Sequence, residues 1–302
     1  MKVVIAGASG VVGTHLIAAL RAEGGHEIVT LSHGRTEGAT PWNPAKAAQG
    51  DSAALTEIVR AIEGADAVVN LSGSSIGEGR LNNERKARVL NSRLDATRAL
   101  ARAHRQCERP AKIWLQASAT GYYGNAGEAR VGEETAPGRD FLADVCVQWE
   151  RTAQQEVHGA RLAICRLGVV LAKDAPAWNK MILPIRLGVG GPLGSGEQWM
   201  AWVDADDAAN AFVFMLKDLR AEGVFNVVSP EPIRQKELAQ RTAHALHRPA
   251  LIPAPAFALR ALLGELADLL VLASCRAVPD HLQKVGFTFA HPNFAEDLSR
   301  LV

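Results

Sequence analysis

The amino-terminal segment constrains the fold of this chain most strongly. An apolar run at residues 3–6 opens directly into three glycines, Gly7, Gly10 and Gly13, and apolar residues with helical spacing follow over residues 14–21. A chain that turns sharply from a buried strand into a closely packed helix needs residues without a Cβ atom at the turn. The pattern therefore predicts a strand, a glycine turn and a helix, beginning near residue 2.

The same turn is typical of a nucleotide site. The free N–H groups of a first helical turn and the positive end of the helix dipole attract phosphate. We therefore predict that the three glycines bind a dinucleotide together with Ser9, Val11 and Val12, which stand between them. Glycines at a tight turn can also serve packing alone, but the strand-to-helix context favours the cofactor.

Strand-like and helix-like stretches alternate along the first 170 residues. The apolar runs lie at residues 3–6, 27–31, 67–71, 113–116 and 162–167. The helix-like stretches include residues 11–23, 51–63, 82–105 and 140–158. This alternation predicts an α/β fold, a doubly wound parallel sheet with helices on both faces.

The domain organisation follows from a change of texture near residue 170. We expect residues 1–170 to form the NAD(P)-binding core, with sheet elements returning at about residues 203–230. Residues 171–302 are expected to form mostly a substrate-side lid, with a small C-terminal domain at about residues 250–302. The glycine-rich loop at residues 188–202 is too long for a simple connector and is the candidate lid.

Some residues of these later segments have two interpretations. In the lid, Gln198, Trp199 and Trp202 are candidate ligand contacts, although the two tryptophans could instead only anchor the loop. The apolar tract at residues 254–273 contains charges, which argues against a membrane span. Its helical periodicity favours a core helix or a subunit contact.

Composition excludes several classes of function. The net charge of +1 gives no electrostatic argument for nucleic acid or membrane partners. The four cysteines form no C-x-x-C pair and the nine histidines show no ligand spacing, so we predict neither a metal site nor disulfides. Because the first predicted strand starts at residue 2, we expect no signal peptide. We expect a cytoplasmic protein acting on a small molecule, with a homo-oligomer left open.

The end of the second predicted strand bears on the choice of cofactor. NAD sites usually place an acid there, to bind the ribose 2′-hydroxyl. Here Ser32, His33 and Arg35 follow the strand, and Glu27 precedes its apolar part. These three residues could receive a 2′-phosphate, although Arg35 could also be a solvated loop residue. We therefore prefer NADP(H) over NAD(H).

Further motifs extend the pattern over the whole chain. They are NLSG at 70–73, Asn91, SATGYYG at 118–124 and WVDADD at 202–207. With the glycines, they resemble an extended short-chain dehydrogenase/reductase with a Rossmann-type sheet and a smaller C-terminal substrate-side region. The segments 141–150, 190–196 and 279–289 resemble its epimerase-like branch, the nucleoside-diphosphate-sugar-epimerase-like proteins with a C-terminal domain of unknown function.

The resemblance implies roles for individual residues. The three glycines would hold the pyrophosphate, and Ser118 would stand beside the nicotinamide. Asn91, counted among the cofactor-binding residues, would bond backbone across the sheet, and Arg93 would reach an anionic substrate. The remaining residues expected to line the cofactor or face the substrate are Asn70, Leu71, Ser72, Gly73, Ala117, Arg166, Leu167 and Gly168. Two positions depart from the family pattern, Ala6 where Thr is common and Asp204 where His is common.

The Tyr-x-x-x-Lys pair of the wider superfamily is missing. In that pair, the lysine and the oxidised nicotinamide lower the pKa of the tyrosine, so that it passes a proton. The chain has two tyrosines, Tyr122 and Tyr123, with no lysine four residues on. Aligning the family's glutamate with Glu150 puts Leu142 and Cys146 in the places of the pair.

Several interpretations of this gap stay open. Tyr122 or Tyr123 could donate the proton with Ser118 polarising the carbonyl, or both rings could be packing groups. Cys146 is expected to be a small buried residue in preference to a reactive thiol, and Asp144 and Glu150 helix-surface charges.

Two functions follow from these expectations. The first is an NADP(H)-dependent oxidoreductase or epimerase-like enzyme acting on a small polar substrate, with sugar nucleotides included. The second is a catalytically inactive NADPH-binding sensor or scaffold.

Overall fold

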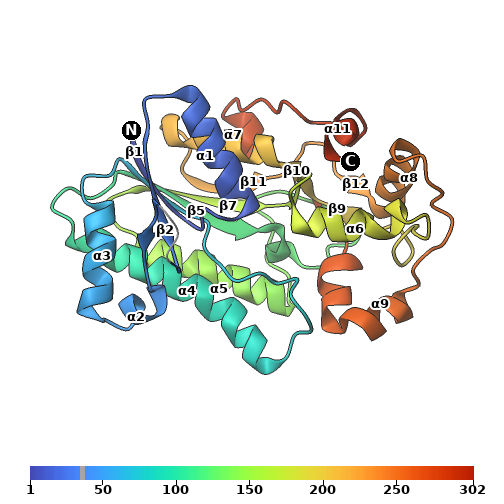
Figure 1. Ribbon diagram of the computed structural model, residues 1–302, viewed down its shortest axis with the longest axis horizontal. Helices are drawn as coiled ribbons and strands as arrows, with labels where there is room; N and C mark the ends of the chain where they lie inside the picture. Colours follow the sequence, from blue (N-terminus) through green and yellow to red (C-terminus); the bar gives the residue numbers. More distant parts are fainter. Residues whose placement is uncertain (35–37) are drawn as a thin grey trace.

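A seven-stranded parallel sheet forms the centre of the computed structural model, which describes residues 1–34 and 38–302 (Figure 1). Its order is β11-β7-β5-β4-β1-β2-β3. The strands are β1 (Lys2–Ala6), β2 (Glu27–Ser32), β3 (Thr40–Pro41), β4 (Ala67–Asn70), β5 (Ile113–Ala119), β7 (Arg161–Leu167) and β11 (Gly223–Val227). The chain leaves β1 toward β2 and β3 and then returns to β4 on the other side of β1. Such a reversal creates a ligand-binding crevice at the carboxyl ends of β1 and β4.

Helices cover both faces of the sheet, which confirms the predicted fold class (Figure 1). One face carries α1 (Val11–Glu23) and α7 (Ala205–Lys217), and the other carries α2 (Pro44–Ala48), α3 (Ser52–Ile62), α4 (Asn83–Gln106) and α5 (Phe141–Glu156). Alternate residues of β1 therefore enter different cores, Val3 and Ile5 on one side and Val4 and Ala6 on the other. A strand buried on both faces reads as a continuous apolar run, which is why its position was predictable.

The remaining elements lie mostly beyond the carboxyl edge of the sheet, on the right of Figure 1. They are a 3₁₀ turn (Thr120–Tyr123), β6 (Arg130–Val131), β8 (Val169–Leu171), α6 (Pro176–Arg186), β9 (Trp199–Met200), β10 (Trp202–Asp204), β12 (Ile233–Arg234), α8 (Gln235–Ala245), α9 (Ala256–Leu263), a π-helical turn (Ala267–Val271), β13 (Arg276–Ala277), α10 (Asp280–Lys284) and α11 (Phe294–Leu301). Part of this region has its own core, in which Trp178 and Trp202 pack edge-on against Phe294 with centroids 6.0 and 5.5 Å away.

The apolar tract at residues 254–273 is divided into two helical pieces. Gly264 ends α9 with a φ of 62°, and the π-helical turn follows. Leu259 and Leu266 are buried, while Phe257 and Leu262 are 75% and 72% exposed. The tract thus contributes to the core with only part of its apolar residues, and a subunit contact stays a prediction. Among the described residues, none of the helices combines the length and apolar content that a membrane span requires.

Candidate cofactor and substrate site

The three glycines of the first turn differ in what their surroundings require. A Cβ on Gly7, whose φ is +83°, would lie 2.6 Å from the carbonyl carbon of Leu71. A Cβ on Gly13 would lie 2.6 Å from the carbonyl oxygen of Gly7. At Gly10 the nearest atom would be 3.5 Å away, an ordinary contact, and φ is −77°. The packing of the chain therefore requires glycine at positions 7 and 13, whereas position 10 only leaves space in front of the helix.

The start of α1 is open to an anion. Side chains of Asp51, Asn82, Asp140 and Asp204 cap α3, α4, α5 and α7, but α1 has neither a side-chain cap nor an acidic residue in its first turn. The first bond of the helix runs from the Thr14 N–H to the Gly10 carbonyl (2.9 Å). The N–H groups of residues 11–13 precede that bond, so they are the natural donors to a phosphate.

The turn after β4 completes the crevice. The buried Asn70 side chain donates to Thr97 and Gln116, and its oxygen accepts from the Ser72 N–H (3.1 Å). Asn70 therefore holds the shape of the turn, and its side chain does not face outward. The Ser72 hydroxyl is buried without a hydrogen-bond partner among the described residues. An orphaned hydroxyl beside Gly7 fits a site that a bound ligand completes.

Two further predicted contacts are packed into the protein. Ala117 is 4% exposed on β5. Gly168 follows β7, and a Cβ there would lie 2.9 Å from the Ala201 carbonyl oxygen. Gly73 lies against the half-buried Arg93, whose guanidinium donates to the Ser74 and Val89 carbonyls. Burial lowers the pKa of Arg93. Its role toward an anionic substrate stays a prediction.

The structure contradicts the expected backbone contact of Asn91. It was expected to bond backbone across the sheet, but it is exposed on α4, and its side chain forms no hydrogen bond within residues 1–34 and 38–302. The next residue, Ser92, instead reaches the loop after β4, with 3.1 Å between its Oγ and that of Ser74. The family resemblance therefore named Asn91, whereas the side chain that contacts this loop is that of the next residue, Ser92.

The end of β2 holds part of the predicted 2′-phosphate site. Ser32 ends the strand, and the His33 ring lies 5.6 Å from that of Trp42. Arg35 lies outside the described residues. Glu27 pairs with Lys2 at the opposite end of the sheet, as its position before the apolar run predicted.

Ser118, at the end of β5, belongs to a buried ionic network. Its hydroxyl donates to Glu150 Oε1 (2.6 Å), and Arg166 on β7 donates to both Glu150 oxygens from Nε and Nη2, at 2.8 Å each. The expectation that Glu150 is a surface charge is wrong, because it is 5% exposed and faces Arg166. The overlooked signal was an arginine inside an apolar strand, which requires an anionic partner.

The network fixes the direction of the Ser118 hydroxyl. Burial lowers the pKa of Arg166, but its hydrogen bonds to Glu150 and the charge of that carboxylate outweigh this effect and raise it. A carboxylate held by a guanidinium accepts hydrogen bonds only, so Ser118 donates its single proton to Glu150. Polarising a substrate carbonyl requires this hydroxyl to turn away from Glu150. Glu150, Tyr123 and the Glu133 carbonyl engage the Arg166 guanidinium, and the contact of Arg166 with the cofactor stays a prediction.

The two tyrosines occupy different environments. The Tyr123 hydroxyl is buried, donates to Asn226 Oδ1 (2.7 Å) and accepts from Arg166 Nη1 (3.0 Å). Burial raises the pKa of Tyr123 to about 12. Tyr122 is half-buried, and the Arg166 guanidinium stacks 3.4 Å from its ring centre. Tyr122 is the more accessible of the two.

Leu142 and Cys146 line the space beside the turn after β5. A Cβ on Gly121 would lie 3.5 Å from the Leu142 Cβ and 3.9 Å from the Cys146 Sγ. Both side chains are 5% exposed. Burial raises the pKa of the Cys146 thiol to about 11, in agreement with the prediction of a buried, unreactive residue.

A small pocket of about 100 Å³ opens next to this turn. The start of α5, β9 and the segment 269–275 close it from three sides. Its lining residues are Thr120, Gly121, Gly124, Asp140, Leu142, Val169, Trp199, Met200, Ala201, Leu269, Leu270, Ala273 and Cys275. Of the candidate lid contacts, only Trp199 reaches the pocket. Trp202 is buried and donates to the Glu231 carbonyl, and Gln198 donates to the Leu193 and Val271 carbonyls, so both anchor the loop.

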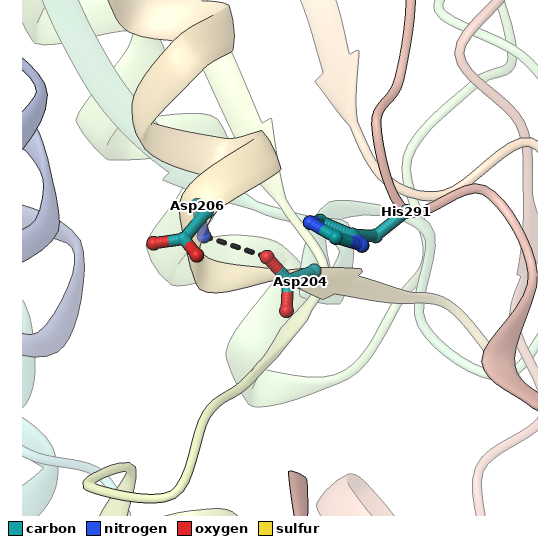
Figure 2. Close-up of side chains that lie close together, drawn as sticks. All are labelled: Asp204, Asp206 and His291. Atoms are coloured by element: carbon teal, nitrogen blue, oxygen red, sulfur yellow. Dashed lines mark hydrogen bonds between the residues drawn. The ribbon is translucent and has the colours of Figure 1, made fainter. Parts of the chain in front are cut away.

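Asp204, Asp206 and His291 form a second polar cluster (Figure 2). One carboxylate oxygen of each aspartate and one ring nitrogen of His291 lie within 4.8 Å of one another. Asp204 caps α7, with its oxygen 2.8 Å from the Asp206 N–H. Asp206 pairs with His15 and Arg300, and Arg300 also contacts His291. The contacts of Arg300 join α11 to the start of α7, so this cluster attaches the C-terminal segment, and the absence of a metal site stays a prediction.

The comparisons with known proteins agree with this architecture. Residues 3–228 match the NAD dependent epimerase/dehydratase family, and residues 254–301 match a domain of unknown function, DUF1731. This chain therefore belongs to the NAD-dependent epimerase/dehydratase family, as the motifs predicted.

Several members resemble it over their whole length. Epimerase family protein ML0860 of Mycobacterium leprae is 35% identical over 98% of this chain and 94% of its own. Human epimerase family protein SDR39U1 is 30% identical, with all of both chains covered. The crystal structure of human SDR39U1 (isoform 2) with NADPH superposes with a TM-score of 0.90 at 31% identity, covering 100% of this chain and 99% of that one.

Proposed function

We propose that this protein binds NADP(H) at the β1–α1 turn and is an oxidoreductase or epimerase acting on a small molecule. One observation carries the proposal. Position 10 is glycine although the packing of the chain does not require it, and the uncapped helix start lies directly behind it. The human relative crystallised with NADPH supports the same cofactor.

The cofactor would contact three parts of the site, namely the β1–α1 turn, the crevice beside it and the end of β2. The N–H groups of residues 11–13 would bind the pyrophosphate, and the orphaned Ser72 hydroxyl would gain a partner. Ser32, His33 and Arg35 would receive the 2′-phosphate of NADP(H). The other proposed contacts are Gly7, Ser9, Gly10, Val11, Val12, Gly13, Leu71, Gly73, Ala117 and Gly168.

A bound nicotinamide supplies or accepts hydride, and the chain contributes the groups that handle a substrate oxygen. Ser118 would polarise that oxygen once its hydroxyl turns away from Glu150, to which it donates in this structure. Tyr122 is the proposed proton donor, because Asn226 and Arg166 hold the Tyr123 hydroxyl. Tyr123 would then support the position of Arg166 and, through it, of Glu150.

The second candidate is a catalytically inactive NADPH-binding sensor or scaffold. It is favoured by Leu142 and Cys146 beside the β5 turn and by the commitment of the Ser118 proton to Glu150. A cytoplasmic location also stays a proposal, since an Arabidopsis thaliana relative is named as chloroplastic.

Thermal unfolding with NADPH and with NADH tests the proposed cofactor. A ligand at 100 times its Kd stabilises the folded state by about 2.7 kcal/mol, so the preferred cofactor gives the larger rise in Tm. We expect NADPH to give it. Equal rises in Tm would contradict the 2′-phosphate argument.

Substitution of the tyrosines tests the proposed proton donor once a substrate is known. Tyr122→Phe is expected to lower kcat by about 10²-fold or more, and Tyr123→Phe is expected to have a smaller effect. Unchanged turnover in Tyr122→Phe would remove that residue from the mechanism.

A further inference from the structure

The pocket beside the β5 turn is positioned to receive part of a substrate. Thr120 and Gly121, which line it, follow Ser118 by two and three residues, and Leu142 approaches from α5. A molecule reacting beside Ser118 would therefore extend into this pocket. This step rests on the proposed function, because it takes Ser118 as the reacting end of the site.

Most of the side chains that line the pocket are apolar. Eight lining side chains are hydrocarbon, thioether or indole groups, namely Leu142, Val169, Trp199, Met200, Ala201, Leu269, Leu270 and Ala273. Among the described residues, no lysine, arginine or histidine lines it. The single carboxylate, Asp140, is engaged as the cap of α5, where it accepts from the Ala143 N–H (2.9 Å). Burial raises the pKa of the Cys275 thiol to about 11, so Cys275 is neutral at pH 7.

Two arginines contact Trp199, one of the lining residues. Arg234 and Arg276 stack on the Trp199 ring, 4.3 and 4.7 Å from its centre. Glu128 accepts from Arg234 Nη2 (2.8 Å) and from the Trp199 indole N–H (3.0 Å), so one of the two guanidinium groups beside this ring is paired with a carboxylate. Neither arginine is among the lining residues.

Size and charge together restrict the occupant. Pockets for drug-sized ligands usually measure about 300–1,000 Å³, whereas this one measures about 100 Å³. A diphosphate buried here would lose hydration without gaining an ion pair, and such desolvation costs several kcal/mol per charge. We infer that the pocket binds an uncharged, apolar part of the substrate, so a small aliphatic alcohol or carbonyl compound fits better than a sugar nucleotide. This differs from the polar substrate that the family resemblance implied, because most of the lining side chains are apolar and none of them is a cation that would pair with a diphosphate.

Ligand-observed NMR on the NADPH-saturated protein tests the inference without requiring turnover. The probes are 1-hexanol, hexanoate with the same chain length and one charge, and UDP-glucose. We expect saturation transfer to 1-hexanol, affinity for hexanoate about tenfold lower, and no competition by UDP-glucose. Hexanoate binding as strongly as 1-hexanol, or displacement of 1-hexanol by UDP-glucose, would overturn it.

A pair of exposed-residue variants locates the binding. Leu270 lines the pocket and is 47% exposed, whereas Leu262 is 72% exposed on α9 and does not line it. Leu270→Asp is expected to lose 1-hexanol binding, and the matched Leu262→Asp to keep it. Equal behaviour of the two variants would refute the location. Thermal shifts with NADPH are measured on the same samples, so failure of cofactor binding is seen separately from failure of the apolar pocket.

Discussion

Gly10 and Gly13 belong to one motif, but a Cβ atom is excluded by packing only at Gly13. At Gly13 the backbone of Gly7 and Ala8 fills the position of a Cβ, while at Gly10 the space is open. Gly13→Ala therefore acts on the fold, by overpacking that costs about 1–3 kcal/mol. Gly10→Ala places its methyl group where the phosphate of a bound cofactor is proposed to lie, with little effect on the fold itself.

The Glu150–Arg166 pair makes a testable contribution to stability. Removing one partner leaves a buried, unpaired charge, so Glu150→Ala is expected to lower the free energy of unfolding by about 3–5 kcal/mol. Glu156→Ala on the same helix breaks an exposed pair with Arg105 and should cost at most about 1 kcal/mol. Urea unfolding compares the two variants, and a similar loss in both would contradict the burial argument.

Sequence reasoning at this scale succeeded where a residue has a local reason. Gly7 was predicted from the turn, and Glu27 was placed at the wrong end of the sheet from its position in the strand. The prediction for Glu150 was wrong, because its position on the helix is typical of a surface charge. Its partner, Arg166, lies sixteen residues later on β7, and only the folded sheet places it opposite Glu150. The prediction for Asn91 was wrong by one residue. Tertiary packing decides which face of α4 points to the loop after β4, and the sequence of the helix does not show this.

At the scale of elements, the start of α7 attaches the C-terminal segment. The two Asp207 oxygens accept from the Ala290 and His291 N–H groups, at 2.8 Å each, and Arg300 on α11 reaches Asp206. Asp297 on α11 is buried next to Asp204. Charged residues of α7 and α11 thus hold the last helix against the sheet domain.

This attachment predicts a pH dependence of stability. Burial and the neighbouring Asp204 carboxylate raise the pKa of Asp297 from 3.8 to about 6, despite His291 and Arg300. The folded protein therefore holds a proton that the unfolded chain releases, and this residue's contribution to stability falls as pH rises from about 4 to about 6. The Tm of Asp297→Asn, relative to the native protein, is expected to rise over that interval.

The control for this prediction is Asp268→Asn. A hydrogen bond from Arg260 lowers the pKa of the exposed Asp268, so its contribution to stability is lost on acidification instead. The Tm difference of this variant should not rise over the same interval. A flat difference for Asp297→Asn would show that its carboxyl titrates normally.

Long elements were predictable and short ones were not. The runs at β1, β2, β4, β5 and β7 and the helices α1, α3, α4 and α5 carry enough apolar periodicity to be recognised. Strands of two or three residues, such as β9 (Trp199–Met200) and β13 (Arg276–Ala277), carry none, and their positions depend on tertiary pairing. The break at Gly264 also escaped prediction, because apolar spacing continues across it.

At the scale of the whole molecule, the carboxyl edge of the sheet brings the separate pieces together. The reversal of strand order places the glycine turn beside the turn after β4. Ser118 is the penultimate residue of β5, the strand that pairs with β4, and the apolar pocket lies just beyond the end of β5. The sheet and its cofactor edge could be predicted from alternating motifs. The pocket could not, because its walls come from segments as distant as residues 120 and 275.

Calorimetric titration with NADPH tests the central claim most directly, using the native protein, Gly10→Ala and a surface control, Gly159→Ala. A Cβ at Gly159 meets nothing within 4 Å, although its positive φ of 74° adds a strain unrelated to the cofactor. We predict one-site binding of NADPH to the native protein and to Gly159→Ala, and affinity at least about tenfold lower in a folded Gly10→Ala. A folded native protein that takes up no NADPH, or a Gly10→Ala variant that binds it equally well, would contradict the account.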